Sequence, residues 1–188
     1  MRTLKTALAG LLLVLAAHAA WAADGVSYSY IDVNYVNTDL ENGPSGDGFG
    51  ARGSVGFGGN FFVFAEFLTL DFDNVDADQY AVGLGGFMEL TGEIDLTGRI
   101  GYVEADLSGD GGLGGSDDGY MASLGVRGRM DAFELEGQGI YRDFSDGGDE
   151  FALNIAGRYY FTENFAAAAE YEIGDDAQNF IVGIRFTF

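Results

Sequence analysis

The feature that most constrains this chain is a two-residue alternation of apolar with polar or small residues, repeated in one segment after another from Gly25 onward. This is the period of a β-strand, and no stretch of this region keeps an apolar stripe at helical spacing. Each segment is about as long as a tilted strand must be to cross a bilayer. The ten segments are 26–36, 48–57, 61–70, 79–88, 94–104, 119–130, 133–142, 151–161, 165–173 and 178–188.

Residues 1–22 have the pattern of a secretory signal peptide. Two basic residues precede an apolar run over 7–17, and the sequence AWA at 20–22 is a small-residue cleavage site. The apolar run is too short for a membrane-spanning helix. We therefore expect a cleaved signal peptide over 1–22 and a single barrel domain over 23–188.

The connections between the predicted strands alternate in character. Short connections occupy 58–60, 89–93, 131–132 and 162–164, whereas acidic connections rich in Gly, Asp and Asn occupy 37–47, 71–78, 106–118, 143–150 and 174–177. Tight turns at one end and longer loops at the other are typical of an all-β, antiparallel, up-and-down transmembrane barrel with an even strand number. We expect ten strands, with both termini periplasmic and the acidic loops extracellular. Eight strands with two irregular hairpins is the alternative.

The alternation also assigns the charges to one face of the predicted sheet. Seven arginines follow the predicted signal peptide, and they fall on the same face as six acids. The only lysine of the chain lies in the predicted signal peptide. Seven positive and six negative groups nearly cancel, which makes their enclosure in a lumen tolerable. The predicted lumen ion-pair network is Asp32, Arg52, Glu66, Arg99, Arg127, Arg129, Glu134, Glu136, Arg142, Arg158, Glu170, Glu172 and Arg185.

The opposite face is bulky and apolar, which favours lipid outside over the inward-facing apolar surface of a soluble, lipocalin-like barrel. On this face every strand offers one aromatic ring near its loop end, as expected of an interfacial girdle. The predicted girdle is Tyr35, Phe49, Phe67, Tyr80, Tyr102, Tyr120, Tyr141, Phe151, Tyr171 and Phe180.

The chain ends on an alternating strand with aromatic residues at Phe186 and Phe188. This ending resembles the C-terminal signal that outer-membrane proteins present to the barrel-assembly machinery. The resemblance implies that this machinery is a partner during biogenesis. Closure of the predicted barrel would pair the free apolar strand with the first strand, which accounts for its stability.

Longer segments also resemble a known family. The segments are VSYSYIDVNYVNTDL at 26–40, GSVGFGGNFFVF at 53–64, DQYAVGLGG at 78–86, DLTGRIGY at 95–102 and FIVGIRFTF at 180–188. They resemble a family of small acidic outer-membrane barrels of xanthomonads and their relatives, which are OmpA/OmpX-like in the wider sense. The resemblance implies a porin-like barrel in the cell envelope of a Gram-negative bacterium, in contact with outer-membrane lipid and lipopolysaccharide.

Composition excludes several classes of function. There is no cysteine, and the one histidine lies in the predicted signal peptide, so the usual nucleophile and base of a hydrolase are missing. The same-face pairs Glu134/Glu136 and Glu170/Glu172 face seven arginines, which favours ion pairing over acid–base catalysis. With 30 acids against nine basic residues, the chain would be repelled by nucleic acid. We expect no enzyme activity and no cofactor.

The weak metal candidates are four aspartates of one acidic connection, Asp71, Asp73, Asp76 and Asp78. The connection lacks the glycine and the terminal glutamate of an EF-hand loop, so we interpret it as an ordinary solvated loop rather than a metal site. Loose binding of divalent cations, between these loops and lipopolysaccharide phosphates, is a further expectation.

Two functional hypotheses remain. In the first, the protein is a structural or surface-interaction barrel, filled by its ion pairs, whose acidic loops serve envelope integrity, adhesion or host contact. In the second, it is a narrow diffusion channel for small solutes or ions. A barrel of ten strands encloses little more than its own side chains can fill, which favours the first hypothesis.

Overall fold

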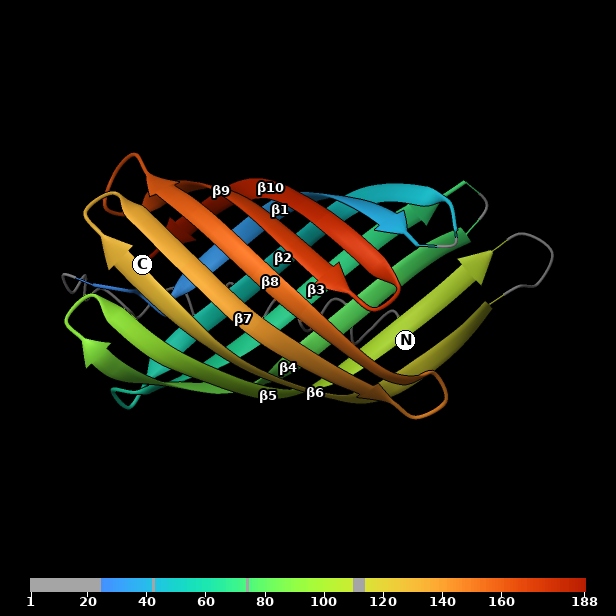
Figure 1. Cartoon of the computed structure of the whole chain (residues 1–188), viewed down its shortest axis with the longest axis horizontal. Coiled ribbons are helices and arrows are strands. Elements are labelled where there is room, and N and C mark those ends of the chain that lie inside the picture. Colours follow the sequence, from blue (N-terminus) through green and yellow to red (C-terminus); the bar gives the residue numbers. More distant parts are fainter. Residues whose placement is uncertain (1–24, 42, 74, 110–113) are drawn as a thin grey trace.

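The described residues, 25–41, 43–73, 75–109 and 114–188 of a computed structural model, form one closed antiparallel barrel (Figure 1). Its strands are β1 (Tyr30–Leu40), β2 (Ser45–Phe57), β3 (Phe61–Phe72), β4 (Val75–Thr91), β5 (Ile94–Gly109), β6 (Gly114–Met130), β7 (Phe133–Phe144), β8 (Gly148–Tyr160), β9 (Phe165–Gly174) and β10 (Ala177–Thr187). No helix in these ranges is long and apolar enough to cross a membrane. The ten-stranded barrel is confirmed, and the eight-stranded alternative is wrong. The predicted signal peptide lies outside the described residues.

The prediction of long acidic loops is wrong, because the strands continue through most of the residues assigned to them. β4 already begins at Val75 and β5 extends to Gly109, although 71–78 and 106–118 were predicted as loops. Asp78 pairs with Asp106 in the ladder between these two strands. The ladder provides hydrogen-bond partners for the backbone N–H and C=O groups, and the acidic side chains on the outer face remain in contact with water. A sequence rich in Asp and Gly can therefore continue as a β-strand.

The final strand closes the barrel. β10 pairs with β9 on one side and with β1 on the other, from Tyr30 opposite Thr187 to Leu40 opposite Ala177. The outward side chains of β10, including Ile184 and Phe186, are exposed. Because both edges of the strand are paired, the apolar C-terminal segment leaves no free strand edge in the barrel wall.

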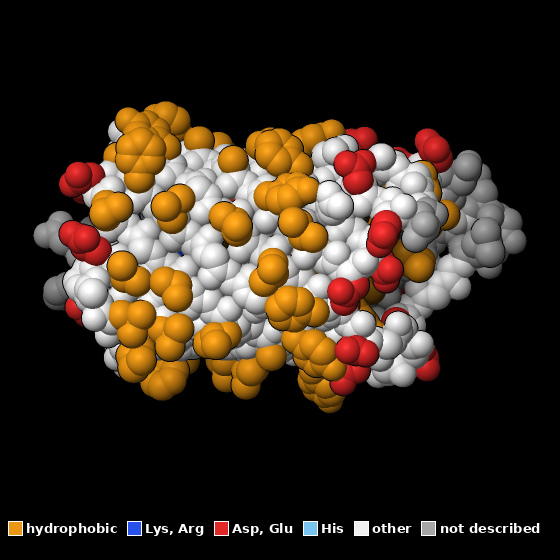
Figure 2. Space-filling view, in the orientation of Figure 1, with side chains coloured by type: hydrophobic (Ala, Val, Ile, Leu, Met, Phe, Trp, Pro, Cys, Tyr) orange, Lys and Arg blue, Asp and Glu red, His pale blue; other side chains and the backbone are white. Residues whose placement is uncertain are grey.

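The outer surface carries an apolar belt (Figure 2). Ile100, Leu124 and Ile155 are each more than 60% exposed, at 66%, 64% and 68%. The residues next to them in sequence, which face the lumen, are polar or small. Such an extended exposed apolar surface needs a nonaqueous environment, and it has the reverse polarity of a water-soluble barrel.

The predicted girdle residues face each other across the hairpins at the acidic end. Each hairpin pairs two rings directly, and the cross-strand pairs are Tyr35 with Phe49, Phe67 with Tyr80, Tyr102 with Tyr120, Tyr141 with Phe151, and Tyr171 with Phe180. The ring centroids of Phe67 and Tyr80 are 5.0 Å apart, and those of Tyr35 and Phe49 are 5.7 Å apart. The belt is therefore bordered by paired aromatic rings at this end.

Beyond these rings the outward positions become acidic, as the red side chains toward the right of Figure 2 show. We call these residues the acidic collar. By strand alternation it comprises Asp39, Asp47, Asp71, Asp76, Asp78, Glu104, Asp106, Asp118, Asp143 and Asp149. The collar lies at the end opposite to the C-terminus and the tight turns (Figure 1).

Candidate functional site

The most distinctive chemistry of the protein lies inside the barrel, where inward positions of seven strands hold a buried group of charges that we call the deep network. Four arginines and four acids make up this group, and hydrogen bonds join them across the lumen. Its members are Asp32, Arg52, Arg127, Glu134, Glu136, Arg158, Glu170 and Arg185. Positive and negative charges are therefore equal in number within it.

Glu134 is the centre of the deep network. Its side chain is fully buried, and Arg127 donates to both of its oxygens at 3.0 Å. Arg158 and Arg185 donate to the same carboxylate at 2.9 and 3.3 Å, and the Tyr160 hydroxyl donates at 3.1 Å. A carboxylate with this many donors retains its charge without water, and each guanidinium depends on it in turn.

Another bidentate contact between an arginine and a carboxylate joins β1 and β10, the first and last strands of the barrel. Arg185 of β10 donates from Nε and Nη2 to the two oxygens of Asp32 on β1, both at 2.7 Å. The guanidinium of Arg185 also lies 3.6 Å from the centroid of the Tyr30 ring. Bidentate Arg–carboxylate pairs fix orientation as well as charge, so this pair sets the register in which the first and last strands close.

A smaller group of charges lies nearer the acidic end, and we call it the mouth network. Arg99 donates to Glu66 at 2.6 Å, while Arg142 donates to Glu150 and Glu172, each at 3.3 Å. Arg99 also donates to the uncharged side chains of Ser123 and Gln138. The mouth network therefore has two arginines and three carboxylates.

Arg129 is not brought into either network. Its Nε donates to the carbonyl oxygen of Asp131 at 3.3 Å, and its guanidinium lies 3.8 Å from the centroid of the Tyr160 ring. Among the described residues no carboxylate lies within ion-pair distance of it. The prediction that Arg129 is part of the lumen ion-pair network is wrong. The strand period puts this residue on the inner face, but it lies beside the β6–β7 turn, beyond the reach of the buried acids.

Sequence reasoning missed Glu150, because residues 143–150 were interpreted as a loop. Its partner Arg142 lies directly opposite in the β7–β8 ladder. Extending the alternation of 151–161 by one inward position, to Glu150, would have identified it.

Sequence reasoning also missed an aromatic part of the interior. Phe62 and Phe64 point inward from β3 and are buried, and the Tyr28 ring stacks between Phe62 and Phe87, with centroid distances of 5.0 and 4.1 Å. Tyr28 precedes β1 in the chain, and its hydroxyl donates to Asp95 at 2.9 Å. Burial raises the pKa of this hydroxyl. These rings fill the side of the lumen that the deep network leaves uncharged.

Two inward glycines make room for these rings. Gly85 lies opposite Phe62, and Gly83 lies opposite Phe64, in the β3–β4 ladder. A Cβ at Gly85 would come within 2.1 Å of the Phe62 ring, and one at Gly83 within 2.2 Å of the Ile100 carbonyl oxygen. A phenylalanine opposite a glycine on the inner face is a sequence signal for such packing.

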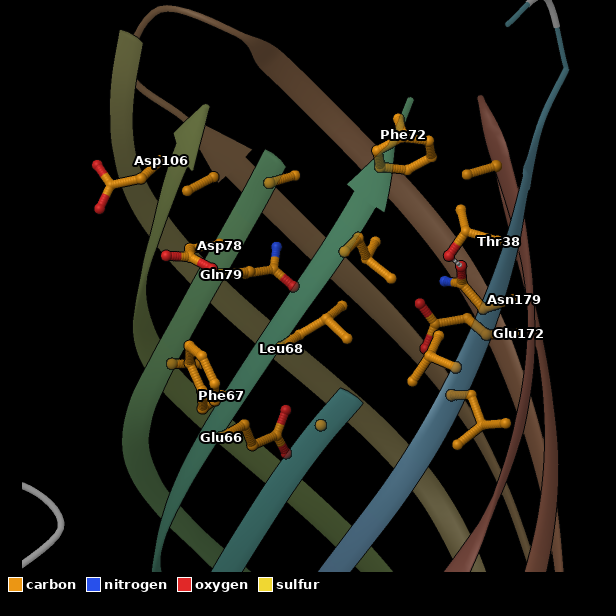
Figure 3. Close-up of a pocket in the computed structure, with 18 of the residues that line it drawn as sticks. Thr38, Glu66, Phe67, Leu68, Phe72, Asp78, Gln79, Asp106, Glu172 and Asn179 are labelled. Carbon is orange, nitrogen blue, oxygen red and sulfur yellow. Dashed lines mark hydrogen bonds between the residues drawn. The ribbon is translucent and has the colours of Figure 1, made fainter. Parts of the chain in front are cut away.

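Above the mouth network the lumen opens into a cavity of about 540 Å³ (Figure 3). Glu66 and Glu172 lie toward its base in this view, Leu68 lies on its wall, and Phe72 lies near its outer end. Thr38 donates to Asn179 at 2.8 Å across the β1–β10 seam beside it. The barrel thus has a hollow section at the acidic end.

The four aspartates considered as metal ligands do not converge. Asp71 and Asp76 pair across the β3–β4 hairpin, and Asp73 adopts a positive φ of 53° beyond it. Among the described residues no group of three or more acidic, histidine or cysteine side chains has metal-binding geometry.

Comparisons with known proteins address the fold. No protein-family model and no curated protein matches the chain. The solved structure of the NanC porin is similar, with a TM-score of 0.57, 11% identity, and coverage of 84% of this chain and 100% of that one. The KdgM porin (TM-score 0.46, 10% identity, 84% and 99% coverage) and Ail of Yersinia pestis (0.37, 17%, 85% and 97%) are also found.

The chain therefore has the fold of a small, porin-like outer-membrane β-barrel. The fold and the exposed apolar belt agree, because only a closed barrel or a helix satisfies every backbone group within lipid. The narrower resemblance to the xanthomonad barrels stays a prediction.

Proposed function

We propose that the protein is an integral outer-membrane barrel with a closed lumen, which serves as a structural and surface-interaction element of the envelope rather than as a catalyst or an open pore. The observation that carries this proposal is the deep network. Its central carboxylate, Glu134, is fully buried, and Asp32, Arg185 and Glu170 are only 1 to 2% exposed. Side chains packed this closely leave no water-filled path through that section of the lumen.

In the proposed orientation the termini and tight turns are periplasmic and the acidic collar is extracellular. The collar would then lie beside the phosphates of lipopolysaccharide, where loosely bound divalent cations offset the repulsion between the two anionic layers. The aromatic C-terminal residues Phe186 and Phe188 would be presented to the barrel-assembly machinery before the seam closes. The anionic outer end is the surface offered for adhesion or host contact.

Planar-bilayer recording of the refolded protein tests the closed lumen. We expect no current steps from the wild-type barrel once insertion is shown by heat-modifiable migration and protease protection. Arg127→Ala removes a buried side chain and should allow conductance, whereas Arg129→Ala, which leaves the deep network intact, should remain silent. Discrete steps from the wild type would instead support the narrow diffusion channel.

Cysteine labelling tests the orientation, since the chain has no cysteine of its own. Asp146→Cys places a thiol at the acidic end and Glu163→Cys places one at a tight turn; both positions are exposed. In intact cells a membrane-impermeant maleimide should label only the first variant. Labelling of only the second would show that the orientation is reversed.

A further inference from the structure

The cavity at the acidic end has unusual walls for the interior of a charged barrel. Most of its lining is apolar and comes from β1, β3, β4, β5 and β10. Among the apolar side chains that line it are Val36, Leu40, Leu68, Leu70, Phe72, Leu107 and Ile181. With a volume of about 540 Å³, it falls within the usual size range of small-molecule sites.

The floor of the cavity is charged, and its charge is unbalanced. Glu66, Glu150 and Glu172 reach it from three strands, and the arginines of the mouth network compensate only two of these three charges. Arg52 also lines the cavity, but its guanidinium is paired with Asp32 and Glu170 of the deep network. The contacts of Arg142 with Glu150 and Glu172 are long, at 3.3 Å, so both carboxylates retain acceptor capacity. The deep network beneath has no such excess.

A neutral side chain also borders the cavity. Asn34 lines it and is only 4% exposed, and its Oδ1 has no hydrogen-bond partner among the described residues. This oxygen is buried against Gly183 of β10, where an added Cβ would come within 2.2 Å of it. The charge of the floor therefore comes from the glutamates and not from this amide.

We propose that this cavity is a binding site for a small amphipathic organic cation, that is, an ammonium group attached to an apolar body. The ammonium would lie on the floor among Glu66, Glu150 and Glu172, and the apolar body would contact the aliphatic walls. A bare metal ion is not the proposed ligand, because no group of three or more acidic, histidine or cysteine side chains with metal-binding geometry is found among the described residues. An organic anion of the same shape would face the excess carboxylate charge.

The acidic collar supports entry of a cation. Asp78 and Asp106 border the cavity, and their carboxylates are directed toward the outer surface (Figure 3). A ring of like charge around an opening raises the local concentration of oppositely charged ligands. The proposal goes beyond the closed barrel and is independent of it, because binding in the cavity requires neither conductance nor its absence.

Isothermal titration calorimetry of the refolded full-length barrel in nonionic micelles tests the site. The probe is hexylammonium, compared with hexanoate, which has a similar apolar chain and a negative head, and with methylammonium, which lacks the chain. We expect saturable binding of hexylammonium, at least about tenfold tighter than that of either comparison ligand. Absence of saturable binding, or equal binding of hexanoate, would overturn the proposal.

Two matched variants locate the binding. Glu172→Gln removes a floor charge and should weaken binding of the cation about tenfold. Asp143→Asn removes the same charge from the exposed collar and should change binding by less than about twofold. Equal effects of the two variants would show surface attraction rather than a site in the cavity. Glu150→Gln, at a more exposed floor position, replaces Glu172→Gln if that variant does not refold.

Discussion

The two charged networks of the lumen use the same residue types and reach opposite results. In the deep network four arginines meet four acids, Glu134 accepts from three of the arginines, and six of the eight side chains are at most 3% exposed. In the mouth network two arginines meet three acids, Arg142 makes only 3.3 Å contacts, and the space above is hollow. Charge balance and the number of partners per group, rather than the presence of charge, thus distinguish a packed section of the barrel from one that is able to receive a ligand.

The largest expected effect comes from Glu134→Gln in the deep network. Neutralising this group leaves four arginines against three acids around a fully buried side chain, so the free energy of unfolding should fall by about 3–5 kcal/mol. Urea unfolding in lipid vesicles, followed by heat-modifiable migration, measures the change. Glu163→Gln makes the same substitution at an exposed turn and should change stability by less than about 0.5 kcal/mol. If the two variants were equally stable, the central role of Glu134 would be refuted.

Gly85→Ala is expected to have the next largest effect, on the aromatic side of the closed section. The added Cβ would lie 2.1 Å from the Phe62 ring, which is packed against Tyr28, so we expect a loss of about 1–3 kcal/mol from overpacking. Gly86→Ala is the control, since its Cβ would come no closer than 3.4 Å to any atom. A loss from Gly86→Ala as large as that from Gly85→Ala would point to backbone effects rather than to the ring.

The sequence predicted which charged residues face the lumen, but not how they divide into two networks. Strand number and facing follow from a local two-residue period, so the inward positions of Arg127, Glu134 and Arg185 could be read directly. Which arginine meets which acid depends on strand tilt and register around the whole barrel, which no single segment encodes. The 24-residue separation of Arg158 and Glu134 spans a β7–β8 hairpin, but Arg52 meets Glu170 from 118 residues away, across the lumen.

The cavity at the acidic end was also not predicted from the sequence, because the residues that line it lie between acidic residues. Residues such as Ala77 and Leu107 alternate with acids of the collar, and this mixture was interpreted as loop. In the structure those acids point outward, while the apolar residues between them line the cavity. An apolar residue between two acids in a barrel hairpin therefore indicates a continuing strand with an apolar inner face.

Arg142→Ala should have the smallest effect on stability and sharpens the comparison most directly. The Arg142 side chain is 13% exposed beside the cavity and its contacts are long, so its removal should lower the free energy of unfolding by about 1–2 kcal/mol, less than the loss of one partner from a fully buried pair. The same substitution takes a positive charge from a floor already in excess of carboxylate, and we expect hexylammonium to bind about tenfold more tightly.

Arg129→Ala provides the matched control, because it removes the same charge at the opposite end of the barrel and should leave the affinity for the cation unchanged. Two results would contradict the distinction between the networks. A stability loss from Arg142→Ala as large as that from Glu134→Gln would mean that the mouth is packed like the deep section. Weaker cation binding by Arg142→Ala would mean that this arginine orients the floor carboxylates, and that its positive charge does not limit the affinity of the site.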